Sequence, residues 1–289
     1  MPTLREVKKR IRTVESTKRI TKAMEMVAAA NLRRAQQRVE QSRPYNRVLE
    51  QLLSHLAAAS TDEITHPFFE EREIKKKTLV LITSDRGLCG SYNGNAIRRA
   101  AQWLRENEEF ECELVTIGKK GNDFFKRRKW PVAQFYGDWG GSIDYEKAKE
   151  IARFLTWRFI HGETDEISLL YTAFISTVRY RLSIDRYLPV ARPEEKEKEV
   201  GYNIDYIFEP SAEAIYSSIL PNYTTSKLII ALAESFASEH GSRMIAMGNA
   251  TSNAEEMVDT LTLQYNKARQ AQITKELLEV VSGAEALSG

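Results

Sequence analysis

The residues best suited to chemistry lie in Ser84-Asp-Arg-Gly-Leu-Cys-Gly90, directly after the apolar run Lys77-Thr-Leu-Val-Leu-Ile-Thr-Ser84. Glycines that follow a buried strand allow backbone amides to approach a phosphate group closely. The full dinucleotide fingerprint G-x-G-x-x-G is absent from this segment. We therefore favour a tight strand-to-helix turn at Gly87 and Gly90 and keep a phosphate site as the alternative.

Cys89 is the strongest candidate nucleophile in the same segment. A neighbouring cation such as Arg86 lowers the pKa of a thiol and so makes it more reactive. A small residue packed into the turn is the alternative, and we favour it.

Other catalytic and metal-binding patterns are missing from the sequence. There is no G-x-x-x-x-G-K-[ST] loop, no G-x-S-x-G elbow and no H-E-x-x-H pair. We expect the adjacent carboxylates of Glu255 and Glu256 to be solvated at the surface and not to form a catalytic acid/base pair. We therefore expect no catalytic residue, no metal site and no cofactor.

Composition narrows the class of protein further. The chain has 289 residues, with 42 Lys and Arg against 40 Asp and Glu, so the net charge is only +2. Two cysteines exclude a disulfide scaffold. No apolar run reaches the roughly 18 residues of a transmembrane span, and the start lacks the apolar core of a signal peptide. We expect an intracellular soluble chain.

The positive charge is concentrated at the start of the chain. Residues 1–43 hold 12 Lys and Arg and four Glu, whereas residues 210–289 have a net charge of −4. A basic helix favours an acidic protein, a nucleic acid or an anionic membrane, although a solvated helix face is an equal alternative. No aromatic residue lies between positions 5 and 43, which disfavours nucleic acid.

Residues 3–58 are predicted to form one long helix. Thr3 and Glu6 have the spacing of a capping box. Apolar or small residues then recur in alternating steps of three and four, which is the coiled-coil period. Pro44 is expected to kink the helix without ending it, because the stripe resumes at Leu49. The stripe is interrupted by Lys18, Glu25, Ser42 and Asn46, and consists of Leu4, Val7, Ile11, Val14, Thr21, Ala28, Leu32, Ala35, Val39, Leu49, Leu53 and Leu56.

Residues 75–190 alternate between short apolar runs and helical stretches. Strands are predicted at 77–84, 113–117, 132–136 and 166–174, with helices near 92–107, 119–128 and 144–161. Such alternation predicts a βαβ sandwich around a mostly parallel sheet. An antiparallel edge pair is expected near 172–189, followed by an exposed charged loop at 192–199.

Residues 210–289 are predicted to form a second long helix, with Ser211 as its cap and Gly283 at its end. Its stripe alternates steps of four and three, and its members are small or polar. They are Met247, Thr251, Ala254, Val258, Leu261, Tyr265, Ala268 and Gln272.

These segments predict an α/β protein, in which a long antiparallel coiled coil of N- and C-terminal helices carries an inserted Rossmann-like βαβ domain. The predicted division is 1–58, 75–190, a loop at 191–209, and 210–289. Because the second helix is longer, its end should extend beyond the first. A bare helix end is unstable in water, so a partner is expected to surround it.

Four motifs in all three segments resemble one known family, the gamma subunit of bacterial F-type ATP synthases. The first two are Arg19-Ile-Thr-Lys-Ala-Met-Glu-Met-Val-Ala-Ala29 and the turn at 84–90. The others, similar to the C-terminal signature of the family, are Ser238-Glu-His-Gly-Ser-Arg-Met-Ile-Ala-Met-Gly-Asn-Ala-Thr-Ser-Asn-Ala254 and Tyr265-Asn-Lys-Ala-Arg-Gln-Ala-Gln-Ile-Thr-Lys-Glu-Leu277.

The resemblance implies a non-catalytic central rotor shaft. In the family, the two helices turn inside a ring of three alpha and three beta subunits, and the α/β body contacts the epsilon subunit and the membrane c-ring. Proton-driven rotation of the c-ring then drives the beta sites through the states of ATP synthesis. The implied location is the cytoplasmic face of the cell membrane, as a peripheral part of the complex without a transmembrane segment of its own.

The resemblance also implies partner-contact residues. Arg269, Gln270 and Thr274 correspond to the polar cluster that meets a catch loop of beta. Lys22 and Met24, with Arg243 on the partner helix, correspond to positions that face an acidic loop of beta. For Met24, plain coiled-coil packing is an equal alternative. A third set lies in the turn near the base of the ring: Asp85, Arg86 and Cys89.

Two departures from the family bear on this interpretation. Gly241 and Gly248 stand where bulkier or charged residues are common, which weakens the helix by roughly 1 kcal/mol each. The inserted cysteine pair of chloroplast forms is absent, so no thiol switch is expected. The main alternative function is a coiled-coil scaffold with a nucleotide-binding α/β domain.

Overall fold

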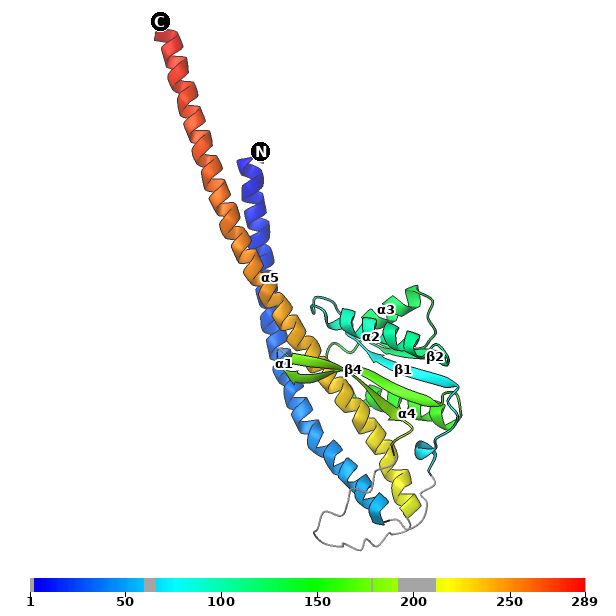
Figure 1. Ribbon diagram of the computed structural model, residues 1–289. Coiled ribbons are helices and arrows are strands. Elements are labelled where there is room, and N and C mark those ends of the chain that lie inside the picture. Colours follow the sequence, from blue (N-terminus) through cyan, green and yellow to red (C-terminus); the bar gives the residue numbers. More distant parts are fainter. Residues whose placement is uncertain (1–2, 60–65, 178, 192–211, 289) are drawn as a thin grey trace. The chain divides into compact units, whose positions relative to one another are not determined.

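The structure is a computed structural model that describes residues 3–59, 66–177, 179–191 and 212–288 (Figure 1). It divides into two compact units. One consists of Met1–Val27 together with Met244–Gly289, and the other is Ala28–Arg243. The two long helices, α1 (Leu4–Ala59) and α5 (Ala212–Ser288), contribute to both units.

Helix α1 begins with the predicted capping box. The Thr3 amide donates to Glu6 Oε2 at 2.9 Å, and the Glu6 amide donates to Thr3 Oγ1 at 3.3 Å. Two N–H groups that the first turn leaves without helical partners are thereby satisfied. Pro44 lies inside α1 and Pro221 lies inside α5, so neither proline ends its helix.

The unit Met1–Val27 with Met244–Gly289 is an antiparallel pair of helices. Lys18 Nζ contacts Glu255 Oε1 at 2.6 Å, and Thr251 Oγ1 donates to Thr21 Oγ1 at 2.8 Å. The residue number rises on α1 as it falls on α5, which confirms the predicted antiparallel arrangement. The predicted stripe of α5 is buried at Met247, Thr251 and Ala254, half-buried from Val258 to Ala268, and exposed at Gln272.

The predicted end of the second helix at Gly283 is wrong. Helix α5 continues through this residue to Ser288. The residues after Gly283 are Ala, Glu, Ala and Leu, which are strong helix formers. A single glycine costs about 1 kcal/mol in a helix and does not stop it when such residues follow. The predicted cap Ser211 and charged loop 192–199 lie outside the described residues.

The unit Ala28–Arg243 is built around a five-stranded sheet with the order β3-β2-β1-β4-β5. Strands β1 to β4 run parallel, and β5 pairs antiparallel with β4, as the expected edge pair requires. The strands are β1 (Lys76–Ile82), β2 (Glu111–Ile117), β3 (Val132–Tyr136), β4 (Glu166–Ser176) and β5 (Arg179–Leu188).

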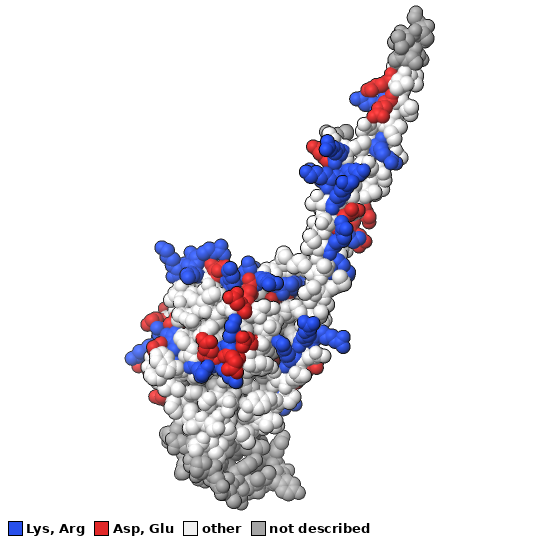
Figure 2. Space-filling view, turned by 180° about the vertical axis from the view of Figure 1, so that it is seen from behind, with Lys and Arg blue, Asp and Glu red and all other residues white. Residues whose placement is uncertain are grey.

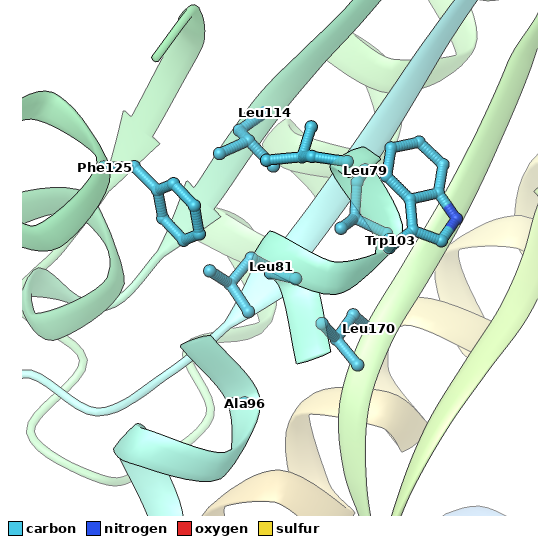
Figure 3. Packing of buried hydrophobic residues seen from close by; sticks show 9 residues of the cluster. Leu79, Leu81, Ala96, Trp103, Leu114, Phe125 and Leu170 are labelled. Carbon is cyan, nitrogen blue, oxygen red and sulfur yellow. The ribbon is translucent and has the colours of Figure 1, made fainter. Parts of the chain in front are cut away.

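The crossover helices are α2 (Tyr92–Glu106), α3 (Lys119–Arg127) and α4 (Tyr145–Ile160), and a short 3-10 helix covers Pro67–Phe69. One hydrophobic cluster joins α2 and α3 to the sheet. Trp103 of α2 and Phe125 of α3 pack with Leu79, Leu81 and Leu114 of the strands (Figure 3). The near-continuous apolar runs of β1 and β2 follow from burial on both faces.

Candidate functional site

The turn after β1 is held by its own polar side chains. Leu88 and Gly90 both adopt positive φ, at 60° and 56°, so the chain reverses tightly here. Ser84 Oγ donates to Asn93 Oδ1 at 3.0 Å. The Asp85 carboxylate accepts the amide of Lys119 at 3.1 Å and that of Trp139 at 2.7 Å. Asp85 thereby ties the turn after β1 to the segments that follow β2 and β3.

Cys89 is a packed residue of this turn. Its side chain is 2% exposed and lies beside Ser84 and Asn93. Burial raises the pKa of the thiol above its ordinary value, and this outweighs the opposing charge of Arg243. The idea of a low-pKa Cys89 activated by Arg86 is therefore wrong, because desolvation disfavours the thiolate.

Arg243 of α5 closes over the same turn. Its guanidinium donates to the carbonyl oxygen of Gly87 at 3.2 Å and to that of Arg86 at 3.4 Å. It also forms a buried ion pair with Glu239, at 2.8 Å. The turn thus presents carbonyl oxygens, not amides, to the helix, and a cation satisfies them.

Two serines of α5 complete the edge of β4. The last residue of β4 that pairs with β1 is Leu170. Beyond it, the Thr172 amide donates to Ser235 Oγ at 3.1 Å, and Ser238 Oγ donates to the Thr172 carbonyl at 3.1 Å. Both serines are buried. Strand β1 no longer pairs with β4 at Thr172, so the two serine hydroxyls provide the hydrogen-bond partners of this residue's amide and carbonyl groups.

Sequence reasoning missed this part of α5. Ser235 lies outside the quoted motifs, Ser238 was only the first residue of the motif 238–254 with no role assigned, and Gly241 was expected only to weaken the helix. A Cβ atom at Gly241 would lie 3.2 Å from the Thr177 carbonyl oxygen. The glycine therefore permits the close approach of α5 to the β4–β5 hairpin. A run of small residues on a helix was the available signal.

Helix α5 covers the position where a Rossmann-like sheet would hold a nucleotide. In doubly wound folds, ligands bind at the carboxyl ends of strands where the strand order reverses. Here that point lies between β1 and β4. Arg243 meets the turn after β1, and Ser235 and Ser238 meet the far end of β4. This geometry favours the tight structural turn over the phosphate site at Gly87.

The residues assigned to the catch loop of beta are exposed near the C-terminal end of α5. Arg269, Gln270 and Thr274 are all exposed. Thr274 Oγ1 donates to the Gln270 carbonyl at 3.0 Å, and Arg269 has no ion pair among the described residues. Four apolar side chains that follow on the same helix are 55–70% exposed: Leu277, Leu278, Val280 and Val281. This part of α5 therefore combines free donors with uncovered apolar surface.

The residues assigned to the acidic loop of beta differ in their surroundings. Lys22 pairs with Glu25 at 3.2 Å and stays exposed, and Met24 is half-buried. Arg243 is engaged inside the other unit, as described above. Basic side chains are frequent along the helical pair (Figure 2). On the same helix, the apolar side chains of Ile20, Met26 and Val27 are each 58–60% exposed.

The described residues provide neither a metal cluster nor a membrane-spanning helix. Among the described residues, no three His, Cys, Asp or Glu side chains gather as a metal site would require. A search of the same residues found no helix long and apolar enough to cross a bilayer.

These features define a class of protein with two parts: an antiparallel pair of helices from the two chain ends, and a Rossmann-like body against which residues 235–243 of α5 pack. A family model described as ATP synthase matches residues 3–287. The ATP synthase gamma chain of Moorella thermoacetica is 48% identical over 287 residues, covering 99% of this chain and 100% of the relative. That of Pelotomaculum thermopropionicum is 46% identical with the same coverage. The chain belongs to the ATP synthase gamma chain family, and its role is that of the central rotor of F1Fo ATP synthase.

Solved structures agree with this assignment. The central stalk and c-ring structure of the mitochondrial ATP synthase of Tetrahymena thermophila contains a chain with 26% identity and a TM-score of 0.61, covering 80% of this chain and 99% of that one. A chain of the Euglena gracilis mitochondrial ATP synthase matches with a TM-score of 0.68 at 20% identity, covering 98% and 94%. At 20% identity, the similarity to the Euglena chain supports only the fold.

Proposed function

We propose that this chain works purely as a mechanical element of the rotor and carries out no bond chemistry of its own. The observation that carries the proposal is the clamp between α5 and the α/β body. Arg243, Ser235 and Ser238 bind backbone groups of the body, so a turning force on the body passes directly into the helix. The same clamp covers the switch point of the sheet, where a cofactor would otherwise bind.

The proposed partners are the alpha3beta3 ring, the epsilon subunit and the c-ring. The assembly named for the Tetrahymena relative, a central stalk with a c-ring, supports the last of these. The exposed apolar end of α5, including Leu278 and Val280, favours an enclosing partner, because burial of such side chains releases roughly 25 cal/mol per Å². The ring of alpha and beta subunits is that partner.

Arg269, Gln270 and Thr274 are proposed to contact the catch loop of beta. Their side chains are exposed, and Arg269 lacks an internal carboxylate partner among the described residues. An exposed guanidinium group without an internal partner can donate charge-assisted hydrogen bonds to a loop of another subunit. Solvent competition keeps each bond weak enough to break as the rotor turns.

Lys22 and Met24 are proposed to face the acidic loop of beta, next to the exposed Ile20, Met26 and Val27. Arg243 has a different place in this proposal. Its guanidinium is held by Glu239 and the turn, so we assign it to positioning the turn. Arg86, which is exposed at that turn, is the group left to meet the base of the ring. Asp85 and Cys89 support it from within.

The proposed location is the cytoplasmic face of the cell membrane, as a peripheral subunit held by its partners. The division into 1–58, 75–190, 191–209 and 210–289 stays a prediction.

Affinity purification of the tagged chain from its native membranes tests the proposal. We expect two further subunits in a 3:3:1 ratio to this chain, with ATPase activity in the eluate. The isolated chain should show no hydrolysis of ATP. Recovery of neither subunit from intact membranes, or ATPase activity in the isolated chain, would contradict the proposal and favour the nucleotide-binding scaffold.

A further inference from the structure

A pocket of about 340 Å³ lies within the unit Ala28–Arg243, and no residue of the turn at 84–90 lines it. One wall is α1, with Asn31, Arg34 and Arg38. Another part of the lining is the glycine loop 140–143, which lies between β3 and α4 in the chain. Ala233 and Phe236 of α5 contribute apolar surface and are each 2% exposed. A volume of this size accommodates a small molecule.

The two arginines of this pocket have no counter-charge. They lie one helical turn apart, so their like charges repel each other. Within the described part of the chain, neither Arg34 nor Arg38 forms an ion pair or a hydrogen bond. By contrast, Arg43 of the same helix pairs with Glu234 at 2.9 Å, and Arg158 of α4 pairs with Glu113 at 2.7 Å. The pocket is therefore a site of uncompensated positive charge.

The glycine loop supplies further donors in a fixed conformation. Gly140 and Gly141 have φ values of 60° and 77°, and the amides of Gly140, Gly141 and Ile143 have no acceptor among the described residues. The buried His240 lies against the loop, with its Nε2 2.9 Å from the Gly141 carbonyl oxygen. A Cβ atom at Gly141 would approach His240 to 2.7 Å, so this position requires glycine.

We propose that this pocket binds a small phosphate-bearing anion. The guanidinium group of arginine can donate two parallel hydrogen bonds to two oxygens of one phosphate group. Backbone amides without acceptors, at consecutive glycines with positive φ, add further hydrogen-bond donors for an anion. The buried side chains of Ala233 and Phe236 close the pocket on the side of α5. The proposal is independent of the rotor function, because neither the coiled-coil end nor the turn at 84–90 takes part in it.

Isothermal titration calorimetry of the full chain tests the proposal, with inorganic phosphate, pyrophosphate and ADP as probes at constant ionic strength. The test variant is R34Q/R38Q. The control is R33Q/R47Q, which removes the same charge from two exposed arginines of α1 that do not line the pocket. Circular dichroism confirms that both variants are folded.

We expect one saturable site for pyrophosphate, at least tenfold weaker in R34Q/R38Q and within twofold of wild type in R33Q/R47Q. Tighter binding of ADP than of pyrophosphate would show that the site also contacts the nucleoside, and equal affinity would limit recognition to the phosphates. The proposal is overturned if none of the probes gives a saturable heat at up to about 10 mM, a concentration that would reveal even a millimolar Kd. Equal losses in the two variants overturn it as well, because general surface charge would then explain the binding.

Discussion

Arg243 and Glu239 form an ion pair inside the protein, one helical turn apart on α5, with 2.8 Å between Nη1 and Oε1. Their side chains are 12% and 5% exposed. The same guanidinium donates to the carbonyl oxygens of Gly87 and Arg86. A single charged group therefore neutralises a buried carboxylate and joins the helix to the turn after β1.

Replacing Arg243 by methionine should destabilise the folded chain by about 3–5 kcal/mol, because Glu239 then stays buried without its cation. Urea unfolding of the full chain measures this loss. R33M is the matched control, since Arg33 is exposed and should change stability by less than about 0.5 kcal/mol. Equal effects of the two substitutions would mean that the buried pair contributes nothing specific.

Stability should depend on pH through Glu239. Burial raises the pKa of its carboxyl above the ordinary value, although Arg243 opposes the shift. The folded state therefore binds the proton more tightly than the unfolded state does. The stabilisation from this group is present below the unfolded pKa of about 4.3 and is lost as the pH rises through the folded pKa. The free energy of unfolding of wild type minus that of E239Q should fall over this range. If this difference in the free energy of unfolding instead grows with pH, the charge of Arg243 outweighs burial and lowers the pKa of Glu239.

The double substitution S235A/S238A should cost about 2–4 kcal/mol, because it leaves the buried amide and carbonyl of Thr172 without partners. Hydrogen exchange at the Thr172 amide should accelerate strongly at the same time. S217A/S218A is a control from the same helix, since both of these serines are exposed. Unchanged exchange at Thr172 would refute the clamp between α5 and β4.

The two glycines of α5 should respond differently to alanine. At Gly248 the added Cβ lies 3.6 Å from the Glu25 side chain, an ordinary contact, so G248A should stabilise the chain by about 0.5–1 kcal/mol. At Gly241 it lies 3.2 Å from the Thr177 carbonyl oxygen, and the strain should cancel most of this gain. Thermal unfolding compares the two. An equal gain in both variants would show that the hairpin does not constrain Gly241.

Substituting Arg269 and Gln270 together by alanine should leave the fold intact, since both are exposed, and should weaken assembly or torque transmission. Loss of one charge-assisted bond of about 1.5–3 kcal/mol corresponds to about a tenfold or greater fall in coupled turnover. ATP synthesis by the reconstituted complex measures it. N266A/K267A, which changes two exposed neighbours, should be nearly neutral. An unfolded R269A/Q270A chain, or normal assembly and turnover, contradicts the assigned role.

The helices, strands and strand directions of this chain could be read from its residue pattern. The stripe from Leu4 to Leu53 is buried or half-buried throughout, and even its polar members Lys18 and Glu25 are not exposed. Periodicity succeeds here because the side chains of a coiled coil contact residues at fixed intervals along both helices. The family motifs likewise identified the rotor, because they lie in separate segments and in one order.

The clamp and the pocket could not be predicted in this way. Ser235, Ser238 and Gly241 are small residues without a distinctive spacing, and their roles depend on where β1 ends relative to β4. Arg34 and Arg38 were indistinguishable from the other cations of the basic N-terminal segment until the glycine loop at 140–143 was placed in the lining of the same pocket. Local sequence specifies the period and the face of an element, because those follow from backbone geometry. Which backbone groups and charges lack a partner is settled by contacts between segments far apart in the chain, and these exist only once the chain has folded.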